Sequence, residues 1–319
     1  MKKEKNISGI SENLSDSIKK QKSTEGKQSN KSILKGKRVA ISVSESEEIE
    51  HLGLSEEHLK DISIEIARYL IVNGAKLLYG GDLRQGGYTE LFSELSYQYK
   101  YLNDKENKIV NYFPFPTSKS LTTDVKANFM KNQVEVKILK IPKELGKINS
   151  KKIFKTFESV DDRFVIAECL TDMRIKMAND SHARIVLGGR QKGFDGYYPG
   201  IVEETYHSLK IGKAVYLLGG FGGVAKSIID IILGKKPNQL TNEFQYNTDI
   251  QKKFRNFAFK KSKINIDYDF MFNFFKNHSI EDISNENGLS VDENRILFES
   301  TNIHELVFLI IKGLLKIQE

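Results

Sequence analysis

The stretch that decides the fold is residues 183–209, which read ARIVLGGRQKGFDGYYPGIVEETYHSL. The apolar residues 185–187 run directly into Gly188-Gly189, a pattern typical of a buried strand that ends in a tight turn. A basic, glycine-bearing loop then leads to Pro199-Gly200, where we expect a helix to begin, because proline suits the first helical turn. Backbone N–H groups at a helix N-terminus attract anions, above all phosphate. The stretch therefore predicts a phosphate-binding strand–loop–helix unit.

The same order of elements recurs elsewhere in the chain. An apolar strand at residues 76–79 runs into GGDLRQGG at 80–87, and another at 214–218 runs into Gly219-Gly220. A first strand, at 38–43, ends among serines. Strands that alternate with helices at this spacing indicate crossover connections and a mostly parallel sheet. We predict a Rossmann-like α/β fold with helices on both faces of the sheet and ligands at the carboxyl ends of its strands.

The spacing of apolar residues places the other elements. We expect further strands over 109–113 and 134–141, and helices between Ser55 and Asn73 and over 89–101, 123–132, 160–180, 200–211 and up to 233. Beyond residue 235 the chain becomes rich in Phe, Asn and Lys, and Ser290 with Glu293 makes a helix-capping box. We predict a basic tail (1–35), a nucleotide-binding domain (36–235) and a helical C-terminal region (236–319).

Net charge argues against nucleic acid as a partner of the folded part. The chain of 319 residues carries a formal charge of +7, with 49 basic and 42 acidic residues. Residues 1–38 hold 11 of the basic and 4 of the acidic residues, so the remainder has 38 of each and is neutral. The positive charge thus belongs to a polar tail that we expect to be disordered, because it has few apolar side chains to bury.

The chain shows no sequence signal for a membrane or a metal. No apolar core of a signal peptide follows the first lysines, and the apolar residues 303–317 are fewer than the roughly 20 that a span needs. The single Cys169 lies in an apolar segment and fits a buried thiol in a cytoplasmic protein. The histidines have no metal-ligand spacing, and neither a GxGxxG nor a Walker loop occurs. We predict a cytoplasmic protein with no metal and no cofactor.

The candidate ligand-binding residues lie at or just after the strand ends. Paired glycines let backbone amides approach a phosphate closely, arginines add charge, and a carboxylate can accept from ribose hydroxyl groups. The predicted ligand-binding residues are Ser42, Ser44, Gly80, Gly81, Asp82, Arg84, Gly188, Gly189, Arg190, Gly200, Glu203, Glu204, Gly219 and Gly220.

Residues 173–204 resemble the SLOG superfamily, which joins the Lonely Guy phosphoribohydrolases, the DprA/Smf DNA-processing proteins and ligand-sensing domains of bacterial antiviral systems. Met177, Ala183, Gly188-Gly189, Gly200 and Glu204 fall at the spacing of the Lonely Guy signature, in which the glutamate is catalytic. The chain departs from that signature where Met173 and Arg174 replace an Arg-Lys pair and Ile201 replaces a threonine. The resemblance covers residues 36–234 and is closest to sensor-type branches found with TIR or sirtuin-like partners.

The resemblance implies three functions. The first is a sensor, a homo-oligomer that binds ADP-ribose or a cyclic ADP-ribose in a bacterial defence system and acts on a TIR or sirtuin-like effector. The second is an enzyme that hydrolyses an N-glycosidic bond of a nucleotide or NAD, with Glu204 and Arg174 as catalytic residues. The third is DprA-like DNA binding, which the neutral folded part disfavours. Whether the chain is an enzyme stays open at this point.

Overall fold

The computed structural model describes residues 32–100, 106–149, 151–155 and 158–317. The predicted basic tail, apart from residues 32–35, lies outside these residues. Residues 34–319 form one compact unit, which is the subject of all that follows.

A parallel sheet in the order β4-β3-β2-β1-β5-β6 forms the centre of this unit. Its strands are β1 (Arg38–Ser44), β2 (Lys76–Gly80), β3 (Ile109–Phe113), β4 (Val134–Ile138), β5 (Ala183–Gly188) and β6 (Ala214–Leu218). The strands β3, β5 and β6 are buried along their whole length, as expected where helices cover both faces of a parallel sheet. The predicted Rossmann-like α/β fold is confirmed.

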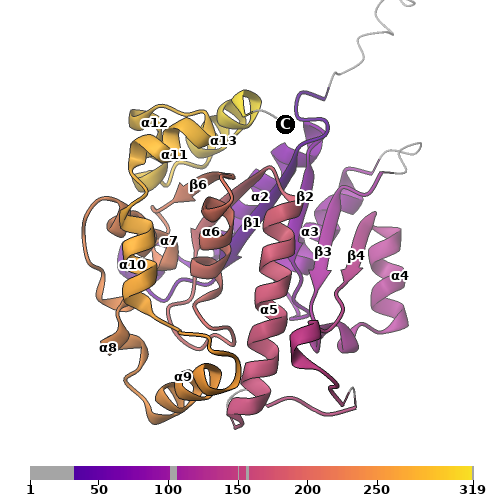
Figure 1. The fold of residues 1–319 in the computed structure, drawn as a ribbon. Helices are drawn as coiled ribbons and strands as arrows, with labels where there is room; N and C mark the ends of the chain where they lie inside the picture. The colour runs from indigo at the N-terminus through magenta and orange to yellow at the C-terminus, as the bar shows by residue number, and fades with distance from the viewer. Residues whose placement is uncertain (1–31, 101–105, 150, 156–157, 318–319) are drawn as a thin grey trace, which may run out of the picture. The chain divides into compact units, whose positions relative to one another are not determined.

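Two layers of helices enclose the sheet (Figure 1). The helices of the α/β part are α2 (Glu56–Val72), α3 (Tyr88–Gln98), α4 (Thr123–Lys131), α5 (Val160–Asp180), α6 (Gly200–Lys210) and α7 (Gly223–Ile232). Helices α5 and α6 lie in front of the sheet in Figure 1, and α2 and α3 lie behind it. The predicted helix over 89–101 ends earlier, at Gln98, and the predicted strand over 134–141 ends at Ile138. Strand β4 stops there because its only partner, β3, ends at Phe113, the residue paired with Ile138.

The C-terminal helices pack against the last strand of the sheet and its neighbours. They are α8 (Asn242–Gln245), α9 (Asp249–Ser262), α10 (Tyr268–Lys276), α11 (Ile280–Asn287), α12 (Val291–Glu299) and α13 (Ile303–Lys316). Helices α11 and α12 contact β6, α10 contacts α7, and α13 contacts α2. The capping box of Ser290 and Glu293 begins α12, as predicted. These helices thereby complete the burial of β6, which would otherwise be an open sheet edge.

Candidate functional site

A pocket of about 500 Å³ lies at the carboxyl ends of β1 and β2 and below the loop that follows β5. The order in which the chain adds strands reverses at β1. Strands β2 to β4 lie on one side of it, and β5 and β6, from later in the chain, lie on the other. Open α/β sheets bind ligands at such a topological switch point. We call this cavity the switch-point pocket.

Most of the predicted site residues line the switch-point pocket. Those that do are Ser42, Ser44, Gly80, Gly81, Asp82, Arg84, Arg174, Arg190, Gly200 and Glu204. The others lie behind its wall or away from it: Gly188, Gly189, Glu203, Gly219 and Gly220. The pocket therefore gathers residues from β1, β2, α5 and α6 that are up to 162 positions apart in the sequence.

Arg184, on β5, organises the floor of the pocket although its side chain is fully buried. Its Nη1 donates to Ser42 Oγ (2.7 Å) and to Glu204 Oε2 (3.0 Å), and its Nε donates to Ser208 Oγ (2.7 Å). Burial lowers the pKa of Arg184, and the adjacent Glu204 carboxylate opposes this. Arg184 thus joins β1, β5 and α6 through a single guanidinium group.

Glu204 is the carboxylate that faces the pocket. Its side chain retains 14% exposure, and its Oε2 accepts from both Ser42 and Arg184. The Nε atom of Arg174 lies 3.8 Å from its other oxygen, Oε1. Two arginines therefore balance the charge of Glu204, and the hydrogen bonds to Oε2 fix its orientation.

Glu203, the preceding residue, has a different role. It is 3% exposed and accepts from Arg174 Nη1 (2.6 Å) and from the Thr171 hydroxyl. Burial by itself would raise the pKa of Glu203, but Arg174, His207 and Thr171 hold it below its ordinary value. Glu203 therefore acts as the buried counterion of Arg174 and is not a lining residue.

Arg174 lies against the N-terminus of α6. A Cβ atom added to Gly196 would come within 2.6 Å of Arg174 Nη1, and one added to Gly200 within 3.0 Å of Nη2. Glycine at both positions therefore leaves space for the guanidinium group. The N-cap of α6, Pro199, supplies no side-chain cap to the first helical N–H groups. The buried Nε of Arg174 has no hydrogen-bond partner within the described part of the chain.

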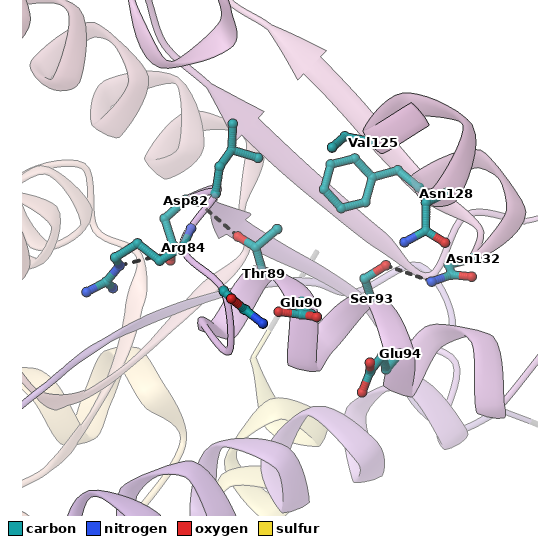
Figure 2. Close-up of a pocket in the computed structure, with 12 residues that line it drawn as sticks. Asp82, Arg84, Thr89, Glu90, Ser93, Glu94, Val125, Asn128 and Asn132 are labelled. Atoms are coloured by element: carbon teal, nitrogen blue, oxygen red, sulfur yellow. Dashed lines mark hydrogen bonds and ion pairs between the residues drawn. The ribbon is translucent and has the colours of Figure 1, made fainter. Parts of the chain in front are cut away.

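At the rim of the pocket, one carboxylate holds two arginines. Glu45, the first residue after β1, accepts from Arg84 Nη1 (3.0 Å) and from Arg190 Nε (2.7 Å). Arg84 also lies 3.6 Å from Asp82, whose backbone N–H donates to Thr89 Oγ1 (Figure 2). The side chains of Glu45, Arg84 and Arg190, which we call the rim cluster, are between 39% and 49% exposed. Solvent and other anions can therefore reach them.

The paired glycines mainly allow other segments of backbone to pack closely against the strand ends. The N–H groups of Gly81 and Gly189 donate to backbone carbonyls of Tyr112 and Ser44. Gly188 and Gly189 have φ of 62° and 111°, which favour glycine. The first turn of α7 packs against them, and its Val224 N–H donates to Gly189 O. The glycine pairs therefore contribute fewer free amides to the pocket than the sequence pattern suggests.

Gly219 and Gly220 are covered by the C-terminal region. A Cβ atom at Gly219 would collide with the backbone of Phe298, in the last turn of α12. One at Gly220 would collide with the backbone of Ser300, the C-cap of that helix. The Gly219 N–H donates to Leu297 O (3.3 Å). These two predicted ligand positions are thus occupied by the chain's own backbone, because the helices after residue 236 pack on β6.

Other pocket residues lacked a clear sequence signal. Tyr79 and Phe194 line the pocket, and Glu45 forms its rim, yet each reads as an ordinary strand or loop residue. Arg184 had a signal that was missed: an arginine inside an apolar parallel strand is buried and must have partners. Cys169 is a buried thiol, as predicted, and burial raises its pKa to about 12.

The described residues contain neither a metal-binding cluster nor a membrane-spanning helix. No group of three or more His, Cys, Asp or Glu side chains is arranged to hold a metal ion there. No helix among them is both long and apolar enough to cross a membrane.

Comparison with known proteins gives one match. A family model described as SLOG cluster2 matches residues 33–297, well over half of the chain. The matched region continues past residue 234 through α11 and into α12, so it includes helices that lie outside the resemblance seen in the sequence. No curated protein and no solved structure matched the chain.

Proposed function

The chain belongs to the SLOG cluster2 family, and we propose that it senses a nucleotide-derived ligand, ADP-ribose or a cyclic ADP-ribose, in the switch-point pocket. Family membership indicates a module that binds or modifies a nucleotide-related ligand. The finer proposal is a cytoplasmic, homo-oligomeric sensor of a bacterial defence system that acts on a TIR or sirtuin-like effector.

The observation that carries this proposal is the position of Arg174. Arg174 is 6% exposed, lines the pocket and places its guanidinium group beside the uncapped N-terminus of α6 at Gly200. One donor, Nε, has no hydrogen-bond partner among the described residues, its nearest carboxylate oxygen being Glu204 Oε1 at 3.8 Å. A buried donor without a partner costs about 1–3 kcal/mol, and a phosphate oxygen would satisfy it together with the first N–H groups of α6.

The rest of the pocket suits the sugar of such a ligand. The Glu204 carboxylate can accept from ribose hydroxyl groups, and the volume of about 500 Å³ is within the range of small-molecule sites. Tyr79 also lines the cavity, and burial raises its pKa well above the ordinary value, so its hydroxyl stays protonated; in the free protein it donates to Asp82 Oδ2 (3.5 Å).

Calorimetric titration tests the proposal. The panel contains ADP-ribose, cyclic ADP-ribose isomers, NAD and nucleoside monophosphates. We expect saturable binding of ADP-ribose or a cyclic isomer, weakened by added salt because phosphate recognition is electrostatic. Absence of binding by every member of the panel would contradict the proposal.

Glu45→Gln should increase the affinity for ADP-ribose by about three- to tenfold. In the free protein Glu45 holds Arg84 and Arg190 where a ligand phosphate would lie, so the phosphate must displace it. Two half-exposed ion pairs contribute about 0.2–1 kcal/mol each, which sets the size of the gain. Calorimetry measures the dissociation constant.

Glu56→Gln is the matched control for this variant. Glu56 lines the same hollows beside the rim as Glu45, and no ion pair between it and an arginine is found in the described residues. It removes the same charge and should change the affinity much less. If Glu45→Gln binds no better than Glu56→Gln, the rim arginines do not contact the ligand's phosphate.

A second candidate, an N-glycosidic-bond hydrolase, is favoured by one observation. Glu204 faces the pocket, is held by Ser42 and Arg184, and adjoins Arg174. A carboxylate so placed could stabilise an oxocarbenium-like centre or position a water molecule. The two candidates differ in what Glu204 does.

Glu204→Gln separates the two candidates. If the chain is a sensor, wild type and variant both leave NAD and nucleotides intact, and the variant binds ADP-ribose about tenfold more weakly because a charged acceptor is lost. Chromatographic detection of released base measures turnover. Release of base by the wild type that disappears in Glu204→Gln would replace the sensor with the hydrolase.

A further inference from the structure

A second hollow adjoins the switch-point pocket. It measures about 280 Å³ and lies between α3, α4 and the loop after β2 (Figure 2). We call it the α3–α4 groove. It shares Asp82, Leu83 and Arg84 with the switch-point pocket, so the two hollows have this short loop as a common wall. A molecule that crosses the loop can occupy both.

The common wall is held in a fixed conformation. The N–H of Asp82 donates to Thr89 Oγ1 (2.9 Å), and the N–H of Arg84 donates to Asp82 Oδ1 (3.1 Å). Gly87 packs so close to Asp82 that an added Cβ atom would lie 2.5 Å from Oδ1. The loop therefore keeps both hollows in place before a ligand arrives.

One side of the groove is apolar. Val125, from α4, lies across from Asp82 and Thr89 in Figure 2, and Phe129, also from α4, and Leu83 belong to the same lining. Phe129 is 5% exposed, which fixes its ring. A flat aromatic ring can bury its apolar faces on such side chains.

The groove also offers hydrogen-bonding groups. Ser93 and Asn132 are buried and bonded to one another, Asn132 Nδ2 donating to Ser93 Oγ (3.0 Å). Asn128, one helical turn before Asn132, is exposed and lies at the same groove (Figure 2). Polar groups beside an apolar ring surface are the combination by which proteins recognise a heterocycle.

The groove is more acidic than the switch-point pocket, whose lining holds three arginines (Arg84, Arg174, Arg190) and three carboxylates (Asp82, Asp195, Glu204). Asp82, Glu90 and Glu94 supply carboxylates, whereas its one arginine, Arg84, is paired with Glu45 and Asp82. Carboxylates repel phosphate and accept hydrogen bonds from amino groups. Across the common wall lie Arg174 and Arg190. The two hollows therefore suit the two ends of one molecule, phosphates in one and an amino-bearing ring in the other.

We propose that the α3–α4 groove binds the nucleobase of the ligand, and that this base carries an exocyclic amino group. The proposal rests on the proposed function of the switch-point pocket and narrows its ligand to nucleotides with an amino-substituted base. Glu94 and Asn128 receive the amino group, and Phe129 carries the ring. Recognition of the base then requires no residue of the phosphate site.

Two ligands that differ only at C6 and in the proton on the neighbouring N1 test this assignment. ADP-ribose has a 6-amino group, and inosine diphosphate ribose has an oxygen there. We expect the wild type to bind ADP-ribose about tenfold more tightly, the effect of one or two hydrogen bonds to a charged acceptor. In Glu94→Ala/Asn128→Ala this preference should fall below about twofold. Both positions are exposed on helices, where alanine is favourable, so the fold is retained.

Asp124→Ala is the control, because Asp124 is exposed on α4 but does not line the groove. It should keep the tenfold preference. Ribose 5-phosphate, which has no base, should bind the double variant and the wild type equally. If the wild type binds both nucleotides equally, or the double variant keeps the preference, the groove assignment is wrong and the phosphate site stands. If neither nucleotide binds the wild type, both proposals fail.

Discussion

Arg184→Met is expected to lower the free energy of unfolding by about 3 kcal/mol, the lower end of the range for removing one partner of a buried ion pair. The arginine is fully buried, and its loss removes the only charged donor within 3.0 Å of Glu204 in the described residues and one donor each from Ser42 and Ser208. Glu204 retains 14% exposure toward the pocket, which keeps the penalty from being larger. Chemical denaturation followed by circular dichroism measures it.

The double variant Arg184→Met/Glu204→Gln shows whether the uncompensated charge causes the loss. Methionine fills much of the arginine's volume, and glutamine carries no charge, so the double variant should recover more than half of the lost stability. A single variant as stable as the wild type would mean that Arg184 does not hold β1, β5 and α6 together. A double variant less stable than the single would mean that Glu204 has other essential partners.

Arg174→Ala should weaken binding of ADP-ribose by about 100-fold. Charge-assisted hydrogen bonds contribute about 1.5–3 kcal/mol each, and Arg174 is the buried cation next to the α6 N-terminus. The same change leaves Glu203 buried without its counterion, so the variant should also be less stable. Binding and stability must therefore be measured on the same preparation.

Arg174→Ala/Glu203→Gln separates the two effects. Removal of the buried carboxylate's charge should restore most of the stability, because Thr171 and His207 can still bond the amide. It should not restore binding, because the arginine is still absent. Recovery of ADP-ribose affinity in the double variant would show that Arg174 acts only by neutralising Glu203.

Much of the fold follows from local patterns in the sequence. The helix expected over 160–180 and the strands expected over 109–113 and 214–218 have those bounds in the structure. Their signals are local: caps, apolar periodicity and glycine stops. The alternation of strands and helices likewise leaves a parallel sheet as the main solution.

The site was harder to predict because its contacts are long-range. No local pattern shows that Glu45 reaches both Arg84 and Arg190, or that residues 297–300 cover Gly219 and Gly220. Paired glycines look the same in sequence whether they admit a phosphate or another segment of backbone. The roles of the adjacent Glu203 and Glu204 depend on which way each faces on α6, and only the packing of α5 decides that.

A crystal structure of the ADP-ribose complex tests the central claim most directly, because it locates the phosphates. We expect a phosphate within hydrogen-bond distance of Arg174 Nε and of the N–H groups of Gly200 and Ile201, with the ribose beside Glu204. A ligand bound with its phosphates anywhere else on the chain, with Arg174 still facing an empty α6 N-terminus, would contradict it.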